Sequence, residues 1–121
     1  MAEFNKLVRD RIPEIIAEKD VSVTCHKVKG DKAINDALFN KLGEETKELQ
    51  QAFSDYFSSG NSQVYESAVI EEMADVLEVL SALCFHAPIC SLKKQVEEKR
   101  QEKLSERGGF EKMWFLESTS E

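Results

Sequence analysis

The chain has 121 residues, of which 41% are hydrophobic and 32% are charged, and its formal net charge is −7. This length and balance fit one folded domain, residues 1–121, with a single core, and they exclude a disordered chain. The negative charge argues against a nucleic acid polymer as partner, although a bound metal ion can reverse the sign of a carboxylate-lined site and admit a small phosphorylated ligand. No stretch approaches the roughly 20 apolar residues of a membrane span.

The cysteine pattern and the first residues predict a cytoplasmic protein. Cys25, Cys84 and Cys90 are odd in number and form no C-x-x-C pair, which argues against a disulfide framework. Residues 1–6 lack the apolar run of a signal peptide. Cys84, His86 and Cys90 could in principle ligate zinc, but no fourth ligand is evident. Buried thiols at a helix end are the preferred interpretation.

The first half of the chain contains two predicted helices. Pro13 suits the first turn of a short helix over residues 12–19. Residues 21–26 alternate between apolar and polar side chains, which predicts one brief extended segment. Asp31 is a credible N-cap for a long helix that continues to about residue 57, because one interior glycine, Gly43, is tolerated.

The second half contains two more predicted helices. A polar loop over residues 58–62 precedes a long helix over 63–86. A further helix over 92–107 ends at Gly108-Gly109. The short apolar tail that begins at Phe110 is expected to pack on the bundle or on a partner chain. The fold class predicted from these elements is all-α: an antiparallel helical bundle with at most one short extended segment.

The helix that starts at Asp31 has carboxylates on its apolar side. At about 100° per residue, its apolar side chains form one stripe roughly 100° wide. The members of this stripe are Ile34, Leu38, Leu42, Leu49, Ala52 and Phe53. Glu45 lies near the middle of the stripe and Glu48 on its margin, whereas Glu44 and Lys47 point away. Two carboxylates on a buried face are unusual, because an unpaired buried charge is costly.

The helix over 63–86 repeats this anomaly. Its predicted inner stripe contains Tyr65, Val69, Met73, Val76, Leu80 and Leu83, widened by Ile70, Leu77 and Cys84. Glu72 lies inside the margin of the stripe and Asp75 flanks it, whereas Glu71 and Glu78 face outward. If the two long helices form an antiparallel hairpin, both carboxylate pairs stand about ten residues, or roughly 15 Å, from the connecting loop.

Four carboxylates that meet between two helices would repel one another strongly unless a cation were bound. Magnesium is the natural occupant, because this hard ion takes carboxylate oxygens, retains several waters and bridges to substrate phosphates. The predicted cage contains no histidine, which disfavours zinc and the carboxylate–histidine di-iron pattern. The structural alternative is that each i, i+3 carboxylate pair lies on a solvated helix face, as such pairs usually do when they stand alone.

Two motifs carry a resemblance to a known family. Residues 45–48 (Glu-Thr-Lys-Glu) and 72–75 (Glu-Met-Ala-Asp) resemble the E-x-x-E and E-x-x-D signatures of the all-α nucleoside triphosphate pyrophosphohydrolases, the MazG-like superfamily. The opening over residues 5–16 and the closing segment over 106–110 are similar to a phosphoribosyl-ATP pyrophosphohydrolase-like branch. The resemblance covers nearly the whole chain. Histidine-pathway members carry a different opening, so it does not point to phosphoribosyl-ATP itself.

The resemblance implies a magnesium-dependent enzyme that cleaves a nucleoside triphosphate to a monophosphate and pyrophosphate, as in the house-cleaning of nucleotide pools. Manganese would be a substitute metal, and a homodimer or homotetramer with sites near subunit contacts is expected. The implied metal ligands are Glu45, Glu48, Glu72 and Asp75. Glu48 would also be the catalytic base for a metal-held water.

The substrate phosphates need positively charged donors besides the metal. The candidates are Lys6, Arg9, Arg11, Lys103 and Arg107. Arg107 is favoured, because the glycines that follow it allow the backbone to close around a ligand. The alternative functions are a non-catalytic helical dimerisation module, which would not explain carboxylates inside two core stripes, and a nucleotide-binding regulator without hydrolysis. The base, the sugar and the intact or damaged state of the nucleotide are not determined by the sequence.

Overall fold

The computed structural model describes residues 2–120, and this part of the chain is all-helical, as predicted. Its elements are α1 (Ile12–Ala17), α2 (Asp31–Ser58), α3 (Gln63–His86) and α4 (Leu92–Arg107). The chain divides into two compact units between Pro88 and Ile89. The expectation of one domain over the whole chain rests on the sequence alone.

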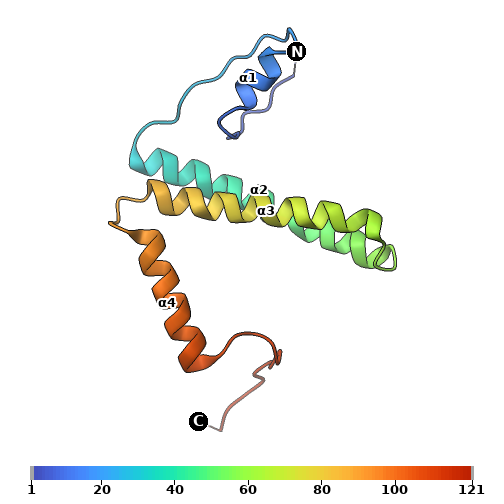
Figure 1. The fold of residues 1–121 in the computed structure, drawn as a ribbon, viewed down its shortest axis with the longest axis vertical. Coiled ribbons are helices and arrows are strands. Elements are labelled where there is room, and N and C mark those ends of the chain that lie inside the picture. Colours follow the sequence, from blue (N-terminus) through green and yellow to red (C-terminus); the bar gives the residue numbers. More distant parts are fainter. Residues whose placement is uncertain (1, 121) are drawn as a thin grey trace. The chain divides into compact units, whose positions relative to one another are not determined.

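The first unit is organised around the α2–α3 hairpin. The two helices, of 28 and 24 residues, run antiparallel and lie side by side (Figure 1). The connection reverses the chain through Gly60 and Asn61, whose φ angles are 74° and 63°. Ser62 then caps α3, because its side chain accepts a hydrogen bond from the backbone N–H of Val64 at 3.3 Å. The predicted hairpin is therefore present.

The inner face of α2 agrees with the predicted stripe. Leu38, Glu45 and Ala52 are buried and recur every seven residues, which is the spacing of a seam between two packed helices. The remaining predicted members are half-buried: Ile34, Leu42, Leu49 and Phe53. One carboxylate thus occupies the central buried position of α2.

The inner face of α3 is turned relative to the predicted stripe. Val79 is buried against α2, and Glu72 lies on the same face seven residues earlier. Tyr65, Met73 and Leu80 were predicted to face inward but are about two-fifths exposed. The reason is that α3 is apolar around much of its circumference, whereas one neighbouring helix covers only a narrow seam.

The segments before α2 are short. α1 ends at Ala17, two residues before the predicted end, because residues 18–20 form a turn with Asp20 at a φ of 57°. Residues 21–26 form no strand pairing within the described part of the chain. Alternation predicts which side chains share a face, but a strand needs a partner backbone.

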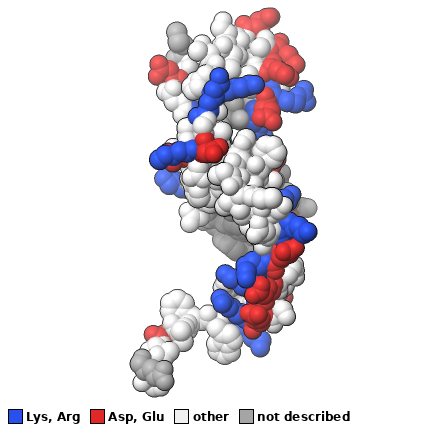
Figure 2. Space-filling model, turned by 90° about the vertical axis from the view of Figure 1, so that its left-hand side faces the viewer, with Lys and Arg blue, Asp and Glu red and all other residues white. Residues whose placement is uncertain are grey.

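The second unit contains α4 and the tail. Side chains of both charge signs line α4 (Figure 2), with ion pairs from Lys99 to Glu102 at 2.9 Å and from Arg100 to Glu97 at 3.1 Å. Gly108, with a φ of 77°, ends the helix. The large apolar side chains of the tail between residues 110 and 116 are at least three-quarters exposed. No helix in residues 2–120 is long and apolar enough to cross a membrane.

Candidate metal centre

The α2–α3 hairpin brings acidic side chains from both helices together. Glu45 of α2 and Glu72 and Asp75 of α3 each offer one oxygen, and these oxygens all lie within 4.8 Å of one another. They meet because positions 72 and 75 lie on the α3 face that packs on α2, opposite the buried position of Glu45. We call Glu45, Glu72 and Asp75 the carboxylate cluster. Glu48, the fourth predicted ligand, is exposed and does not belong to this group.

Glu45 is the most deeply placed member, with only 5% of the residue exposed. Lys41, one turn earlier on α2, lies with Nζ 3.2 Å from Glu45 Oε1. The other oxygen, Oε2, is buried and has no hydrogen-bond partner among residues 2–120. A buried carboxylate oxygen without a partner is costly, so this atom marks the place where a positively charged or hydrogen-bonding ligand would be favoured.

Glu72 carries the second orphaned oxygen. Its Oε2 is likewise buried and unpartnered within the described residues. Burial, a hydrogen bond to Glu48 and the negative charges of Glu48, Glu45 and Asp75 together raise the pKa of Glu72 to about 7. A hydrogen bond between two carboxyl groups requires a shared proton. Glu48 therefore acts on the cluster through its effect on Glu72.

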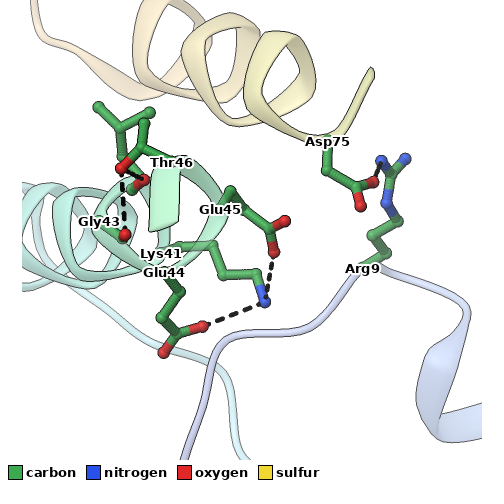
Figure 3. Close-up of polar contacts among 8 residues, drawn as sticks. Arg9, Lys41, Gly43, Glu44, Glu45, Thr46 and Asp75 are labelled. Atoms are coloured by element: carbon green, nitrogen blue, oxygen red, sulfur yellow. Dashed lines mark hydrogen bonds and ion pairs between the residues drawn. The ribbon is translucent and has the colours of Figure 1, made fainter. Parts of the chain in front are cut away.

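Two side-chain cations already touch the cluster (Figure 3). Arg9, from the segment before α1, donates to Asp75 at 2.5 Å. Lys41 lies between Glu45 and Glu44, at 3.2 and 3.4 Å. Burial lowers the pKa of Lys41, but hydrogen bonds and attraction to Glu45 and Glu44 outweigh this and raise it. These contacts balance only part of the negative charge, since both orphaned oxygens remain.

Lys41 was not recognised in the sequence as part of the site. The sequence spacing could have indicated this contact, because a residue four positions before Glu45 lies on the same helix face. A lysine beside a stripe is ordinarily a solvated residue. Here its side chain is only 19% exposed, and the burial of Glu45 accounts for its position.

The donor set suits magnesium or manganese. All three cluster residues offer carboxylate oxygens, which hard cations prefer. The cluster oxygens lie within 4.8 Å of one another, so Glu45, Glu72 and Asp75 could hold a divalent cation after side-chain rotation. The cysteine and histidine side chains near the end of α3 form no comparable group in the described part of the chain.

The predicted phosphate-binding residues are placed in different surroundings. Among the five predicted phosphate-binding residues, Arg9 is the one with an ion pair to the cluster in the described part of the chain. Lys6 lies over the ring of Phe4, with Nζ 5.7 Å from its centroid, and Arg11 pairs with Glu14 of α1 at 3.8 Å. The other two, Lys103 and Arg107, are exposed on α4 in the second unit. Their role toward a substrate stays a prediction.

No family model, curated protein or solved structure matches this chain significantly. The resemblance to the MazG-like superfamily therefore rests on the motifs quoted above.

Proposed function

We propose that this protein is a magnesium-dependent nucleoside triphosphate pyrophosphohydrolase of the MazG-like type. The observation that carries the proposal is the pair of buried, unpartnered oxygens, Glu45 Oε2 and Glu72 Oε2, on facing helices. A purely structural acidic pair would normally be solvated or fully paired. The proposed activity is the cleavage of unwanted nucleotides in the cytoplasm.

Charge explains why the site would need a metal. A triphosphate is repelled by an uncompensated carboxylate cluster, whereas a divalent cation reverses the local sign. Magnesium, when bound, would polarise the phosphates and lower the pKa of a coordinated water. Glu45, Glu72 and Asp75 would hold it. Glu48, whose negative charge acts on Glu72, would complete the set by turning toward the ion.

Glu48 would also serve as the base. Glu48 is exposed to solvent, and its negative charge contributes to the raised pKa of Glu72, which places its carboxylate beside the cluster. It would take a proton from the attacking water as the water oxygen bonds to the α-phosphorus. The bond from this phosphorus to the α,β-bridging oxygen breaks, and that oxygen leaves with pyrophosphate. Arg107 and the N-terminal cations would bind the phosphate oxygens.

We further propose that the active form is a homodimer or homotetramer. α3 exposes apolar side chains along a second face at helical spacing. They are Ile70, Met73, Leu77 and Leu80, which are 69%, 40%, 61% and 43% exposed. A second copy of the same face would cover this stripe through a two-fold contact, and the apolar tail offers additional surface.

Release of pyrophosphate tests the enzymatic proposal. Incubation with a panel of standard and damaged nucleoside triphosphates and magnesium should yield the monophosphate and pyrophosphate for at least one substrate. Glu45→Gln should abolish the reaction, whereas Glu44→Gln, a carboxylate loss at the exposed neighbouring position, should not. A panel without turnover, but with magnesium-dependent nucleotide binding, would favour the nucleotide-binding regulator. No binding at all would favour the dimerisation module.

A further inference from the structure

The side chain of Arg9, in the segment before α1, reaches the carboxylate cluster. Arg9 and Asp75 are 66 positions apart in the sequence, yet Arg9 Nη2 lies 2.5 Å from Asp75 Oδ1 (Figure 3). Asp75 is also one of the residues whose oxygens converge with those of Glu45 and Glu72. The Asp75 carboxylate therefore binds the Arg9 guanidinium and, under the proposed function, would also bind the metal.

The two claims on this carboxylate compete. If Asp75 Oδ1 kept its contact with Arg9 and also bound magnesium at about 2.1 Å, the ion and the guanidinium nitrogen would stand at most about 4.6 Å apart. A dication and a cation at this distance repel each other. Arginine cannot relieve the repulsion by losing its proton, because its pKa lies above 12. The bound ion therefore favours an arrangement in which the side chain of Arg9 has moved away from Asp75.

The side chain of Arg9 is less constrained by its surroundings than that of Lys41. The side chain of Arg9 is 57% exposed and that of Asp75 is 35% exposed, so their contact is a solvent-screened ion pair of small net strength. Arg9 also belongs to a segment without regular structure. Lys41 is only 19% exposed and sits one helical turn from its partner Glu45, so α2 itself fixes that pair.

We propose, on the basis of the proposed function, that Arg9 is an exchangeable counter-ion. It neutralises Asp75 in the metal-free protein, and it transfers to the phosphates of the substrate when a divalent cation occupies the cluster. The guanidinium suits both partners, because its planar fork matches carboxylate and phosphate oxygens alike. The N-terminal segment thereby supplies the Arg9 guanidinium to the substrate phosphates only when a metal ion is bound.

Calorimetric titration with magnesium alone tests the first half of the exchange. Arg9→Gln removes the competitor and should bind magnesium about two- to fivefold more tightly than the parent, as expected for the loss of an exposed ion pair. Lys19→Gln is the control: it removes one positive charge at an exposed position of the turn that follows α1. Its magnesium affinity should equal that of the parent.

Inorganic pyrophosphate tests the second half. At a fixed saturating concentration of free magnesium, Arg9→Gln should bind pyrophosphate about tenfold more weakly than the parent, because a charge-assisted contact to phosphate is lost. The side-chain Nε–Hε resonance of Arg9 in the parent should shift when magnesium is added and shift again with pyrophosphate. A role confined to holding the fold would weaken or leave unchanged both affinities rather than move them in opposite directions.

The outcomes separate this proposal from the proposed function. Equal or weaker magnesium binding by Arg9→Gln, with a parent that binds magnesium and releases pyrophosphate from nucleotides, overturns the exchange alone. A tighter magnesium complex with unchanged pyrophosphate affinity also overturns it, because Arg9 then has no second partner. A parent that neither binds magnesium nor hydrolyses a nucleotide overturns the proposed function, and the exchange with it.

Discussion

Replacing Glu72 with Gln should stabilise the metal-free protein. The substitution keeps the size of the side chain but removes one negative charge from a group of oxygens that lie within 4.8 Å of one another. Two unit charges at that separation repel by about 3.5 kcal/mol at an effective dielectric constant of about 20, and by about 0.9 kcal/mol in bulk water. Arg9 and Lys41 offset part of this repulsion. We therefore expect a gain of about 1–2 kcal/mol at pH 8.

The gain should depend on pH with a definite sign. The pKa of Glu72 is about 7 in the folded protein, against 4.5 for the model carboxyl group. Below pH 4.5 the Glu72 carboxyl is protonated in both the folded and the unfolded state, so its ionisation takes nothing from the stability of the fold. As the pH rises toward 7 the unfolded chain ionises first, and stability is lost. The uncharged Gln side chain escapes this loss, so the advantage of the variant is largest at pH 8 and mostly absent near pH 5.

Thermal unfolding measures the effect. For a chain of this length, about 1–2 kcal/mol raises the melting temperature by about 3–8 °C. Millimolar magnesium should raise the melting temperature of the parent and do so less for Glu72→Gln, since a ligand that binds only the folded state stabilises it. Glu71→Gln, which removes an exposed carboxylate at the neighbouring position, should change the melting temperature by less than about 2 °C at either pH.

Two results would refute the reasoning. One is a Glu72→Gln variant that melts no higher than the parent at pH 8, which would mean that the carboxylates do not repel one another. The other is a parent whose melting temperature ignores magnesium both alone and with a nucleotide. In that case the metal cage does not exist and the hydrolase proposal fails.

Three further substitutions test other parts of the molecule. Arg107→Ala should raise the Michaelis constant or lower turnover at least about tenfold, an effect of roughly 1.4 kcal/mol, and unchanged kinetics would make Arg107 an ordinary surface residue. Leu77→Lys places a charge on the exposed apolar stripe of α3, so light scattering at micromolar concentration should show a smaller assembly than the parent; a monomeric parent would contradict the homo-oligomer. Ser62→Ala removes the N-cap contact to Val64 and should cost about 1 kcal/mol in urea unfolding, with Ser67→Ala on the exposed side of α3 as a control that unfolds like the parent.

Much of the fold was determined by local sequence. Periodicity, the proline at position 13 and the glycines at 60 and 108 predict four helices whose bounds differ by at most two residues from those of the structure. Start and stop residues act through nearest-neighbour backbone geometry, which needs no tertiary information. The proximity of the two carboxylate pairs also followed from counting residues to the loop, because a hairpin of two straight helices fixes the level of each position.

The tertiary structure decided which residues come together in the candidate site. Periodicity shows which side chains of α3 share a face, but several faces are apolar, and only packing against α2 selects the one with Glu72 near its centre and leaves Met73 and Leu80 exposed. The contact of Arg9 with Asp75 joins segments 66 positions apart through one flexible side chain, so no local pattern encodes it. The two unpartnered oxygens, Glu45 Oε2 and Glu72 Oε2, also depend on tertiary structure. Each oxygen is buried only because α2 and α3 pack against each other.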